Sequence, residues 1–555
     1  MVKKLALVAI CLAYLCGNAM AQDAKTVIAN AQKALGDLKS ITYSGSAKNV
    51  AFQQCGGNSV QPICKGIHDP MQPINNYVRV IDLTAPLSRA TGTTMNFVGG
   101  GGSTTIGPGT FNQSITAQQT DVSQPWNNAL EFYLTPWGFL KGAAANNATV
   151  SKSKNYTVLT WSPTVKAASG KNYTINGYVN DKNIVERVET WLGDNIMGDM
   201  HILAVYSGWK DFGGVMAPAK IVQTRGEWPF FEVTVTAAKA NPPDLATLAL
   251  PPPAAGRGGA AAGAPAAAAP AGGGRGGAAA GAPAAGAPAG GRGGAAAGAP
   301  AAPAGGAARG GQAPAAPPLP GAAAAPARGG GGAAAPLAVT SEKLGDGVYR
   351  LTTGNGSYDS VIVEFKDYVM MLEAGQSIAR GEAYIAETKK LIPNKPIRYV
   401  MNTHPHADHT GGLPALVEEG AIIITQKNNV EFLERALNTP RTLLTDSLAK
   451  NPKPAKVEAV AEKKVYSDGT RTVEMYHIPG APHSNGLIIA YIPKEKVLFQ
   501  GDFSLPTMPG EAANDHIKAL VPVLEKLKLD FNRYINVHAS AAPQTKAELW
   551  KAVGK

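Results

Sequence analysis

The chain has 555 residues and a formal net charge of +11 at pH 7. This length is too great for a single hydrophobic core, so several domains are expected. Seven of the positive charges are Lys3, Lys4 and the five arginines between residues 257 and 328, so only a small excess is left for the segments that can fold. A charge this small and dispersed argues against a nucleic-acid partner.

Residues 1–21 have the three parts of a cleavable secretory signal. A lysine pair is followed by an apolar stretch, Leu5–Cys16, and then by the small-residue sequence Ala19-Met20-Ala21. Lipid anchoring at Cys16 is the alternative, but Leu15 stands where a lipoprotein signal has a small residue. We therefore expect cleavage after Ala21 and a periplasmic or secreted protein. The mature chain has no further apolar stretch long enough to be a transmembrane segment.

Residues 22–249 are predicted to form a first domain that is mainly antiparallel β. The segment Ala24–Leu38 has apolar residues at helical spacing and opens the domain. Short apolar runs separated by Gly, Asn, Asp and Pro follow it, and six of the seven tryptophans lie among them. The predicted strands are Ile41–Ser44, Tyr156–Trp161, Tyr173–Val179, Ile184–Trp191, His201–Tyr206, Lys220–Thr224 and Phe231–Thr236.

The strand pattern of Asp181–Asn241, with its central sequence Gly214–Lys220, resembles that of the outer-membrane lipoprotein carrier superfamily. This resemblance implies a half-barrel with a helical lid and an apolar concavity, and hence an apolar ligand as a partner. His68 and His201 stand alone in this domain and are interpreted as ordinary surface or core residues.

Only Cys55 and Cys64 remain after signal cleavage, and they flank a turn-rich stretch. An even number of cysteines in an exported protein predicts a disulfide that closes this short loop, and two free thiols are the alternative. Neither cysteine lies near the histidine cluster described below, so neither is counted as a metal ligand.

Residues 250–337 consist almost wholly of Ala, Gly and Pro with spaced arginines. The ten residues Gly256–Pro265 recur identically at 274–283 and 291–300. A stretch without aromatic or acidic residues buries too little apolar area to offset the entropy lost on ordering. We predict a disordered linker. The Arg-Gly-Gly triplets suggest nucleic-acid binding as an alternative, which the lack of interleaved aromatic residues disfavours.

Residues 338–555 are predicted to form a layered α/β domain. Several of its strand runs are apolar throughout, as in sheets covered on both faces. The predicted strands are Val361–Phe365, Tyr368–Leu372, Ile397–Met401, Ala421–Thr425, Val473–Ile478, Leu487–Ile492 and Val497–Gln500. The predicted helices are Ile378–Leu391, Val430–Leu437 and His516–Leu527.

Four potential metal ligands follow the strand Ile397–Met401 within six residues: His404, His406, Asp408 and His409. Alternation along an extended segment brings His404 and His406 to the same side, and the following turn lets Asp408 and His409 face a second point nearby. Zinc prefers imidazole nitrogen with some carboxylate oxygen. The cluster therefore predicts a metal site that can serve two ions.

Residues 338–555 resemble the metallo-β-lactamase superfamily, whose fold is an αββα sandwich. The His-x-His-x-Asp-His motif matches residues 404–409, and later motifs match Pro482–Gly486, Val497–Asp502 and Ile535–His538. Glu373 stands where the family usually has Asp, in a position that supports a loop. The resemblance implies a first metal held by His404, His406 and His483, and a second held by Asp408, His409 and His538, with Asp502 bridging. His477 and His516 match no motif and are interpreted as structural.

This ligand set implies an exported hydrolase with two divalent metal ions, most simply Zn²⁺, with iron and manganese as alternatives. A metal-bridging hydroxide would attack an ester, lactone, thioester or lactam, and Asp408 would orient the nucleophile and accept its proton. One alternative is a β-lactamase proper. The other is a carrier of apolar ligands with an ancillary metal domain, and the intact ligand set favours the enzyme. The metal motifs do not determine which small-molecule substrate is used.

Overall fold

The computed structural model describes residues 23–36, 38–49, 71–84, 87–97, 106–116, 125–243, 245, 337–353, 358–481, 483–506, 513, 515–538 and 542–555. The predicted signal, Cys55 and Cys64, and nearly all of the predicted linker lie outside these residues. No helix among the described residues is both long and apolar enough to cross a membrane.

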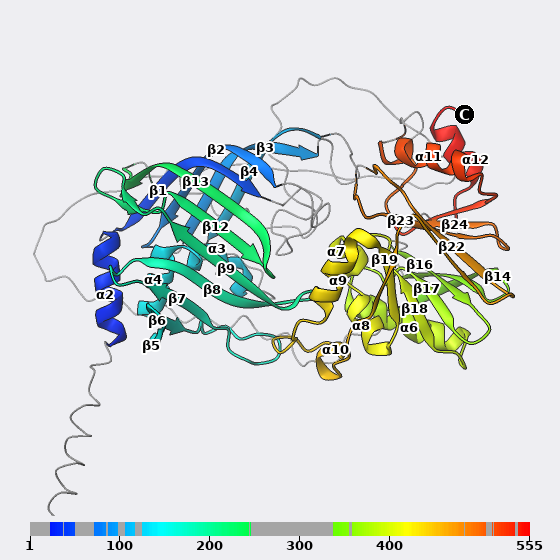
Figure 1. The fold of residues 1–555 in the computed structure, drawn as a ribbon, viewed down its shortest axis with the longest axis horizontal. Helices are drawn as coiled ribbons and strands as arrows, with labels where there is room; N and C mark the ends of the chain where they lie inside the picture. The colour runs from blue at the N-terminus through cyan, green and yellow to red at the C-terminus, as the bar shows by residue number, and fades with distance from the viewer. Residues whose placement is uncertain are drawn as a thin grey trace, which may run out of the picture. The chain divides into compact units, whose positions relative to one another are not determined.

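The N-terminal half is mainly antiparallel β, as the sequence predicted. Eleven strands of the described residues form one sheet in the order β4-β3-β2-β1-β13-β12-β9-β8-β7-β6-β5, and every neighbouring pair is antiparallel (Figure 1). The bounds are β1 Ser40–Asn49, β2 Gln72–Asp82, β3 Leu87–Phe97, β4 Ile106–Thr116, β5 Thr149–Ser153, β6 Tyr156–Trp161, β7 Ile175–Val179, β8 Val185–Asp194, β9 Gly198–Ser207, β12 Lys220–Arg225 and β13 Trp228–Ala240. A separate two-stranded ladder joins β10 Lys210–Asp211 to β11 Met216–Ala217.

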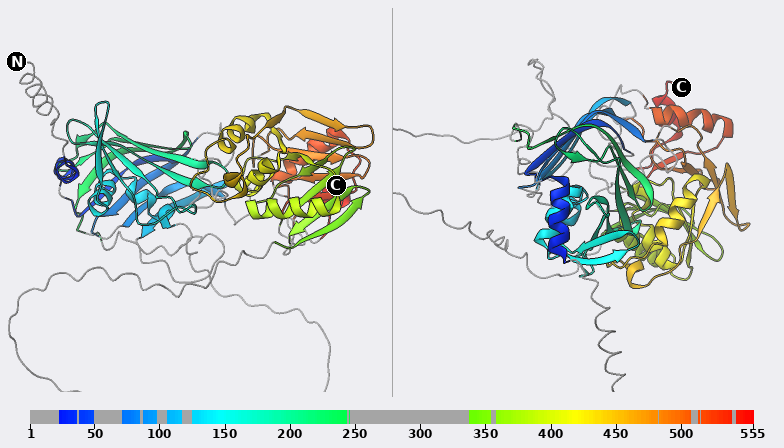
Figure 2. Two further views of the ribbon diagram at one scale, coloured as in Figure 1. Left: turned by 90° about the horizontal axis from the view of Figure 1, so that it is seen from below. Right: turned by 60° about the vertical axis from the view of Figure 1, so that its left-hand side comes forward.

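Three helices accompany this curved sheet: α2 Ala24–Leu35, α3 Pro125–Tyr133 and α4 Pro136–Ala145 (Figure 2). Helix α2 begins where the Asp23 side chain accepts a hydrogen bond from the backbone N–H of Lys25. Its buried residues are Val27, Ile28, Ala31 and Leu35, which is the helical spacing that the sequence predicted. Helix α4 packs against β6 and β8, and its Phe139 fits beside Gly177, where an added Cβ would lie 2.1 Å from the ring.

The C-terminal part contains two further sheets among its described residues. A seven-stranded sheet has the order β14-β15-β16-β17-β18-β19-β20, and a five-stranded sheet has the order β21-β22-β23-β24-β25. The pairs β17–β18, β18–β19, β19–β20 and β24–β25 are parallel. The bounds are β14 Val339–Gly345, β15 Val348–Thr353, β16 Asp359–Glu364, β17 Val369–Leu372, β18 Ile397–Met401, β19 Ile422–Gln426, β20 Val457–Val460, β21 Lys463–Ser467, β22 Thr472–His477, β23 Ile488–Ile492, β24 Val497–Gln500 and β25 Arg533–Asn536.

One apolar core joins side chains of the two sheets, and it includes Val363 and Met370 of the larger sheet and Met475 and Phe499 of the smaller one. Helices cover the outer faces (Figure 1). Residues of α6 and α8 pack on the larger sheet, and residues of α11 pack on the smaller one. The helices are α6 Ile378–Leu391, α7 Ala407–Thr410, α8 Leu413–Glu419, α9 Val430–Leu437, α10 Ser447–Lys450, α11 Asp515–Leu527 and α12 Lys546–Ala552. This arrangement is a helix–sheet–sheet–helix sandwich.

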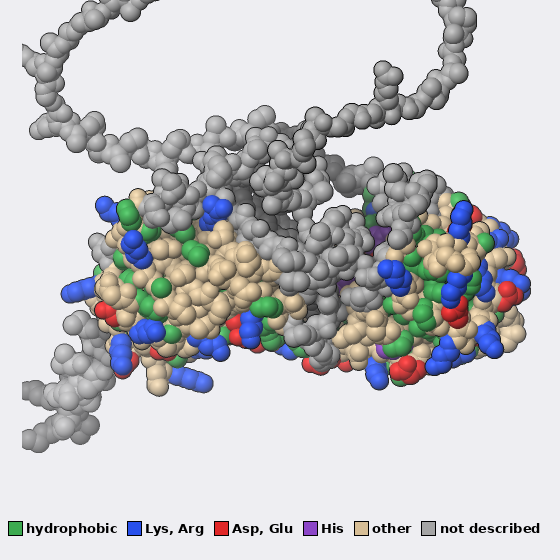
Figure 3. Space-filling view, turned by 90° about the horizontal axis from the view of Figure 1, so that it is seen from above, with side chains coloured by type: hydrophobic (Ala, Val, Ile, Leu, Met, Phe, Trp, Pro, Cys, Tyr) green, Lys and Arg blue, Asp and Glu red, His purple; other side chains and the backbone are tan. Residues whose placement is uncertain are grey.

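The charged side chains on one face of the described residues are mixed in sign. On the face drawn in Figure 3, Lys and Arg are interspersed with Asp and Glu and do not gather in one large patch. This distribution agrees with the small charge excess noted for the folded segments.

Candidate metal centre

The histidine cluster lies where β18 ends and the chain turns into α7. His406 is the N-cap of α7, and Asp408 and His409 lie within that helix. The turn packs tightly on the loop after β17, because a Cβ on Gly411 would lie 2.0 Å from the Gln376 carbonyl oxygen. A Cβ on Gly412 would lie 2.1 Å from the Ala374 carbonyl oxygen. The two glycines therefore let the ligand-bearing turn approach this loop.

Strand pairing brings two distant residues to the same sheet edge. Strands β24 and β25 are parallel, and Gln500 at the end of one is paired with Asn536 at the end of the other. Asp502 and His538 each lie two residues beyond that pair. They therefore leave the sheet side by side.

His483 reaches the site from the connection between β22 and β23. The backbone N–H of Ile488 donates to the carbonyl of Thr403 over 2.9 Å, which ties the start of β23 to the residue before His404. The buried Asn429 donates to the Gly486 carbonyl over 2.7 Å and holds the loop that follows His483. His483 is thus positioned by both of its flanking segments.

All seven sequence-predicted ligands fall into two groups in which the potential ligand atoms lie within 4.8 Å of one another. The first group is His404, His406, His483 and Asp502, and the second is Asp408, His409 and His538. The Nε2 atoms of His404 and His483 are 3.0 Å apart, and those of His409 and His538 are 3.3 Å apart. The Nε2 atom of His406 is buried without a hydrogen-bond partner among the described residues. Such convergence of nitrogen and oxygen atoms fits a metal ion in each group.

The two oxygens of Asp502 face different groups. Oδ2 lies 2.5 Å from His483 Nε2 and 3.4 Å from His404 Nε2. Oδ1 lies 2.7 Å from His538 Nε2 and 3.1 Å from His409 Nε2. Burial opposes ionisation of this carboxyl, but the surrounding histidines outweigh it and hold the pKa of Asp502 well below its usual value. One carboxylate can therefore serve two ions.

Two histidines of the first group and two of the second differ in the direction of their pKa shifts. Burial, together with neighbouring histidines, holds the pKa of His404 well below its usual value and lowers the pKa of His406 to about 3. Burial also acts on His409 and His538, but the nearby carboxylates of Asp502 and Asp408 outweigh it and raise the pKa of both. The histidines His404 and His406 are therefore neutral at pH 7, whereas His409 holds a proton that a metal ion must displace.

Glu373 supports the site and belongs to neither ligand group. Its side chain is fully buried, and its Oε2 atom accepts a hydrogen bond from Thr403 Oγ1 over 2.6 Å. The same oxygen lies 3.3 Å from His409 Nδ1, on the side of the ring away from the ligand atoms. Its φ of 74° is unusual for a residue with a side chain. A buried carboxylate behind a ligating histidine orients the ring and increases its basicity.

Sequence reasoning missed Tyr358. Its hydroxyl lies 3.3 Å from Asp408 Oδ2, and its ring packs 4.9 Å from the ring of His538. The Arg380 guanidinium lies over the tyrosine ring, and the Tyr384 hydroxyl donates to the Tyr358 carbonyl over 2.8 Å. The residue is thus held on several sides beside a candidate ligand. No pattern in the sequence marks it, because its partners lie far along the chain.

His477 and His516, which matched no motif, make local contacts. His516 Nδ1 lies 3.2 Å from the Asp502 carbonyl oxygen, and its ring packs 4.8 Å from that of His483. His477 Nε2 lies 3.2 Å from the Asn485 carbonyl oxygen. Neither belongs to a ligand group.

The C-terminal part of the chain is similar to known proteins. The chain is similar to the structure of a metallo-β-lactamase from Pontibacter korlensis, with 17% identity and a TM-score of 0.31 over 39% of this chain and 98% of that one. It is similar to a metallo-β-lactamase from Hirschia baltica, with 21% identity and a TM-score of 0.29 over 39% of this chain and 95% of that one. It is also similar to a metallo-β-lactamase from Erythrobacter litoralis, with 16% identity and a TM-score of 0.29 over 39% of this chain and 95% of that one. The sequence model of the metallo-β-lactamase superfamily matches residues 353–538, a range that holds both ligand groups. This part of the chain is therefore a metallo-β-lactamase superfamily region.

Proposed function

We propose that the protein is an exported hydrolase that uses two divalent metal ions to cleave an ester, lactone, thioester or lactam. The observation that carries this proposal is the position of Asp502, whose two oxygens face two separate groups of histidines. A carboxylate whose two oxygens face two donor groups can bridge a pair of adjacent ions. The catalytic region is 338–555, preceded by the β-rich domain 22–249 and the linker 250–337.

The donor set suits zinc, because it combines imidazole nitrogens with carboxylate oxygens. Iron and manganese are the alternatives for the same donors. Ions bound in the two groups would lower the pKa of a water molecule toward neutrality and polarise the carbonyl of the substrate.

Asp408 has the catalytic role among the proposed ligands. Its side chain is 40% exposed, whereas that of its neighbour His409 is fully buried. An accessible carboxylate beside the second group can orient an attacking water molecule and accept its proton. His404, His406 and His483 have no such exposure and serve only to bind.

A carrier of apolar ligands is the second candidate function. The curved sheet of 22–249 and its aromatic core, in which Trp126 packs against Tyr133, Trp161 and Tyr173, support a half-barrel with an apolar ligand. In that case the metal region would be ancillary. The complete set of seven candidate ligands favours the hydrolase.

The test is a hydrolysis panel on the full-length protein loaded with zinc, iron or manganese. The panel contains an aryl ester, an acyl-homoserine lactone, an acyl thioester and a β-lactam. We expect metal-dependent turnover of at least one class, abolished by a chelator and restored by metal. Two bound ions per chain without turnover of any class would support the carrier instead. Failure to bind metal would contradict both the site and the hydrolase.

Removal of the Tyr358 hydroxyl tests its contact with Asp408. In Tyr358→Phe the carboxylate loses a hydrogen bond that limits its rotation. A lost hydrogen bond of this kind is worth about 0.5–1.5 kcal/mol, so we expect kcat to fall by roughly 2–10-fold. Tyr399→Phe is the matched control, because Tyr399 packs against Tyr368 and Tyr466 and lies outside the ligand groups. Equal kcat values in the two variants would contradict a role for Tyr358.

Metal binding should release more protons at the second group than at the first. His404 and His406 are already neutral at pH 7, whereas the pKa of His409 lies well above its usual value and that of His538 is also raised, so an ion must displace a proton at least from His409. Affinity at the second group should therefore fall first as pH decreases. Calorimetric titration in buffers of different ionisation enthalpy counts the protons released. His538→Ala, which retains the first group, should release fewer protons per ion than the wild type.

A further inference from the structure

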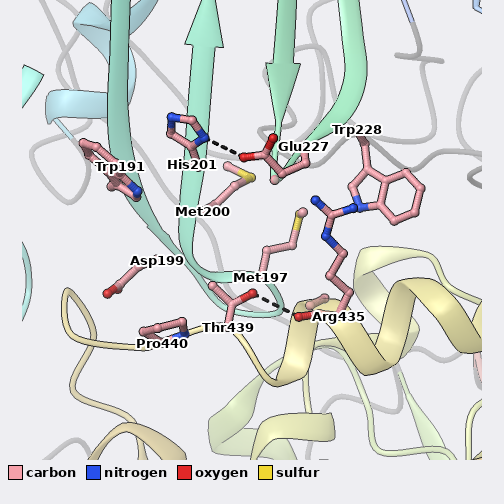
Figure 4. Close-up of a pocket in the computed structure, with 12 residues that line it drawn as sticks. Trp191, Met197, Asp199, Met200, His201, Glu227, Trp228, Arg435, Thr439 and Pro440 are labelled. Atoms are coloured by element: carbon pink, nitrogen blue, oxygen red, sulfur yellow. Dashed lines mark hydrogen bonds and ion pairs between the residues drawn. The ribbon is translucent and has the colours of Figure 1, made fainter. Parts of the chain in front are cut away.

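A cavity with a volume of about 320 Å³ lies among residues that belong to neither ligand group (Figure 4). Its walls come from β8 and β9, the turn between β12 and β13, helix α9 and the segment that follows it. The lining residues are Trp191, Met197, Asp199, Met200, His201, Gly226, Glu227, Trp228, Arg435, Ala436, Thr439 and Pro440. A cavity of this size accommodates a small organic molecule.

One wall of the cavity is fixed by backbone hydrogen bonds. The Asp199 carboxylate accepts the backbone N–H groups of Thr442 over 2.8 Å and Leu443 over 2.9 Å. The backbone N–H of Asp199 in turn donates to the Pro440 carbonyl over 2.6 Å. Asp199 is therefore engaged by these donors and is not available to a cationic ligand.

The other carboxylate in the lining is also engaged. Glu227 Oε1 lies 2.6 Å from His201 Nδ1, and the Nε2 atom of the same ring lies 3.3 Å from Glu189 Oε2. Hydrogen bonding to Glu189, supported by Glu227, raises the pKa of His201 above its usual value, which favours the charged form of the ring beside these two acids. The Trp191 ring stacks on His201 at 5.1 Å.

Two donors in the lining remain without acceptors among the described residues. The Nε1–H group of Trp228 is buried and has no hydrogen-bond partner. The Arg435 guanidinium lies 5.0 Å from the centre of the Trp228 ring, and no ion pair with a carboxylate of the described residues is found for it. Figure 4 shows Arg435 and Trp228 next to each other, with Met197 and Met200 close by.

From this combination we propose that the cavity binds a small carboxylic acid with a flat apolar body. The carboxylate would accept hydrogen bonds from the Arg435 guanidinium and the Trp228 indole N–H, which match its charge and its two oxygens. The apolar body would pack against the rings of Trp191 and Trp228 and the thioethers of Met197 and Met200. This assignment does not depend on the hydrolase activity proposed above.

The experiment is a calorimetric titration of the full-length protein with 2-naphthoate. The protein is first freed of metal by a chelator and dialysed, so that the probe cannot bind an ion in the metal centre. The neutral 2-naphthamide and the cationic 2-naphthylmethylammonium have the same ring system without the carboxylate. We expect 2-naphthoate to bind with one site per chain and at least tenfold more tightly than either analogue.

Variants locate the site. Because a hydrogen bond to a charged group is strong, Arg435→Gln should weaken binding by about 10–100-fold. Trp228→Phe keeps the ring and removes the donor, and it should weaken binding several-fold. Arg398→Gln is the matched control, since Arg398 also lies over an aromatic ring, that of Tyr368, at 4.8 Å. It should leave the affinity unchanged.

The proposal is overturned by an absence of 2-naphthoate binding or by equal affinity for the three probes. It is also overturned if Arg435→Gln binds 2-naphthoate as tightly as the wild type, or if Arg398→Gln loses as much affinity as Arg435→Gln does. Thermal unfolding of each variant is measured beside the titrations. If Arg435→Gln unfolds at a lower temperature, the Trp228→Phe result and the order of the three probes decide the question.

Discussion

Asp408→Asn is expected to lose about 10²–10⁴-fold in turnover while the first metal ion stays bound. Asparagine has nearly the same shape as aspartate, so the turn that carries the cluster keeps its geometry. The substitution removes a negative charge and a proton acceptor, and the loss of a general base typically has an effect of this size. The first ligand group, which does not include Asp408, should retain its ion.

His404→Ala is the comparison for this experiment. His404 belongs to the first group, and its Nε2 atom lies 3.0 Å from that of His483. Its removal should release the first ion, in contrast to Asp408→Asn. Metal content by mass spectrometry and turnover are measured together on both variants. Unchanged turnover in Asp408→Asn would refute the proposed mechanism, and loss of both ions would show that Asp408 acts only through metal binding.

Several elements of the C-terminal part could be predicted closely from the sequence, whereas others, such as β14, β15, β20 and β21, were not predicted. The bounds of α6 Ile378–Leu391, β18 Ile397–Met401, α9 Val430–Leu437 and β24 Val497–Gln500 are the predicted ones. These segments are apolar runs or helical patterns with polar residues at both ends, so local preference and tertiary burial agree. Because their apolar faces pack against other elements, each element begins and ends where its apolar pattern does.

Much of the N-terminal half could not be predicted in this way. Strands β3 Leu87–Phe97 and β4 Ile106–Thr116 are rich in Thr, Asn and Gly, and β4 contains a proline. Helix α4 Pro136–Ala145 contains two glycines and begins with a proline, a composition that is typical of a loop. It is a helix because seven of its residues are buried in the domain, so tertiary packing overrides weak local preference.

In the candidate site, too, some residues could be predicted from their local sequence and others could not. The four ligands of residues 404–409 stand out by their spacing alone. His483, Asp502 and His538 could be assigned only through the family resemblance, because strand pairing and loop connections bring them to the cluster from far along the chain. His201 looked isolated in the sequence for this reason too. Its partners Glu189 and Glu227 lie 12 and 26 residues away and become neighbours only through sheet pairing.

Glu373→Gln is expected to lower the affinity of the second group for its metal ion by about 10–100-fold. This is the usual effect of changing a carboxylate behind a ligating histidine. Glu373 Oε2 faces His409 Nδ1 at 3.3 Å, while the Nε2 atom of that ring faces the other candidate ligands of the second group. The carboxylate therefore increases the basicity of the ligating nitrogen. Glutamine preserves the volume of this fully buried side chain and removes its charge.

Glu373→Asp separates the effect of charge from that of shape. Aspartate keeps the negative charge on a shorter side chain, so this variant should retain more affinity for the second ion than Glu373→Gln does. The first ion should change less in both variants, because Glu373 reaches His404 only indirectly, through Thr403 Oγ1 at 3.1 Å from His404 Nδ1. Stepwise metal titration of the two variants gives both affinities. If the affinity for the first ion falls more than the affinity for the second, Glu373 acts mainly by holding Thr403. That result would contradict the proposed electrostatic effect of Glu373 on His409.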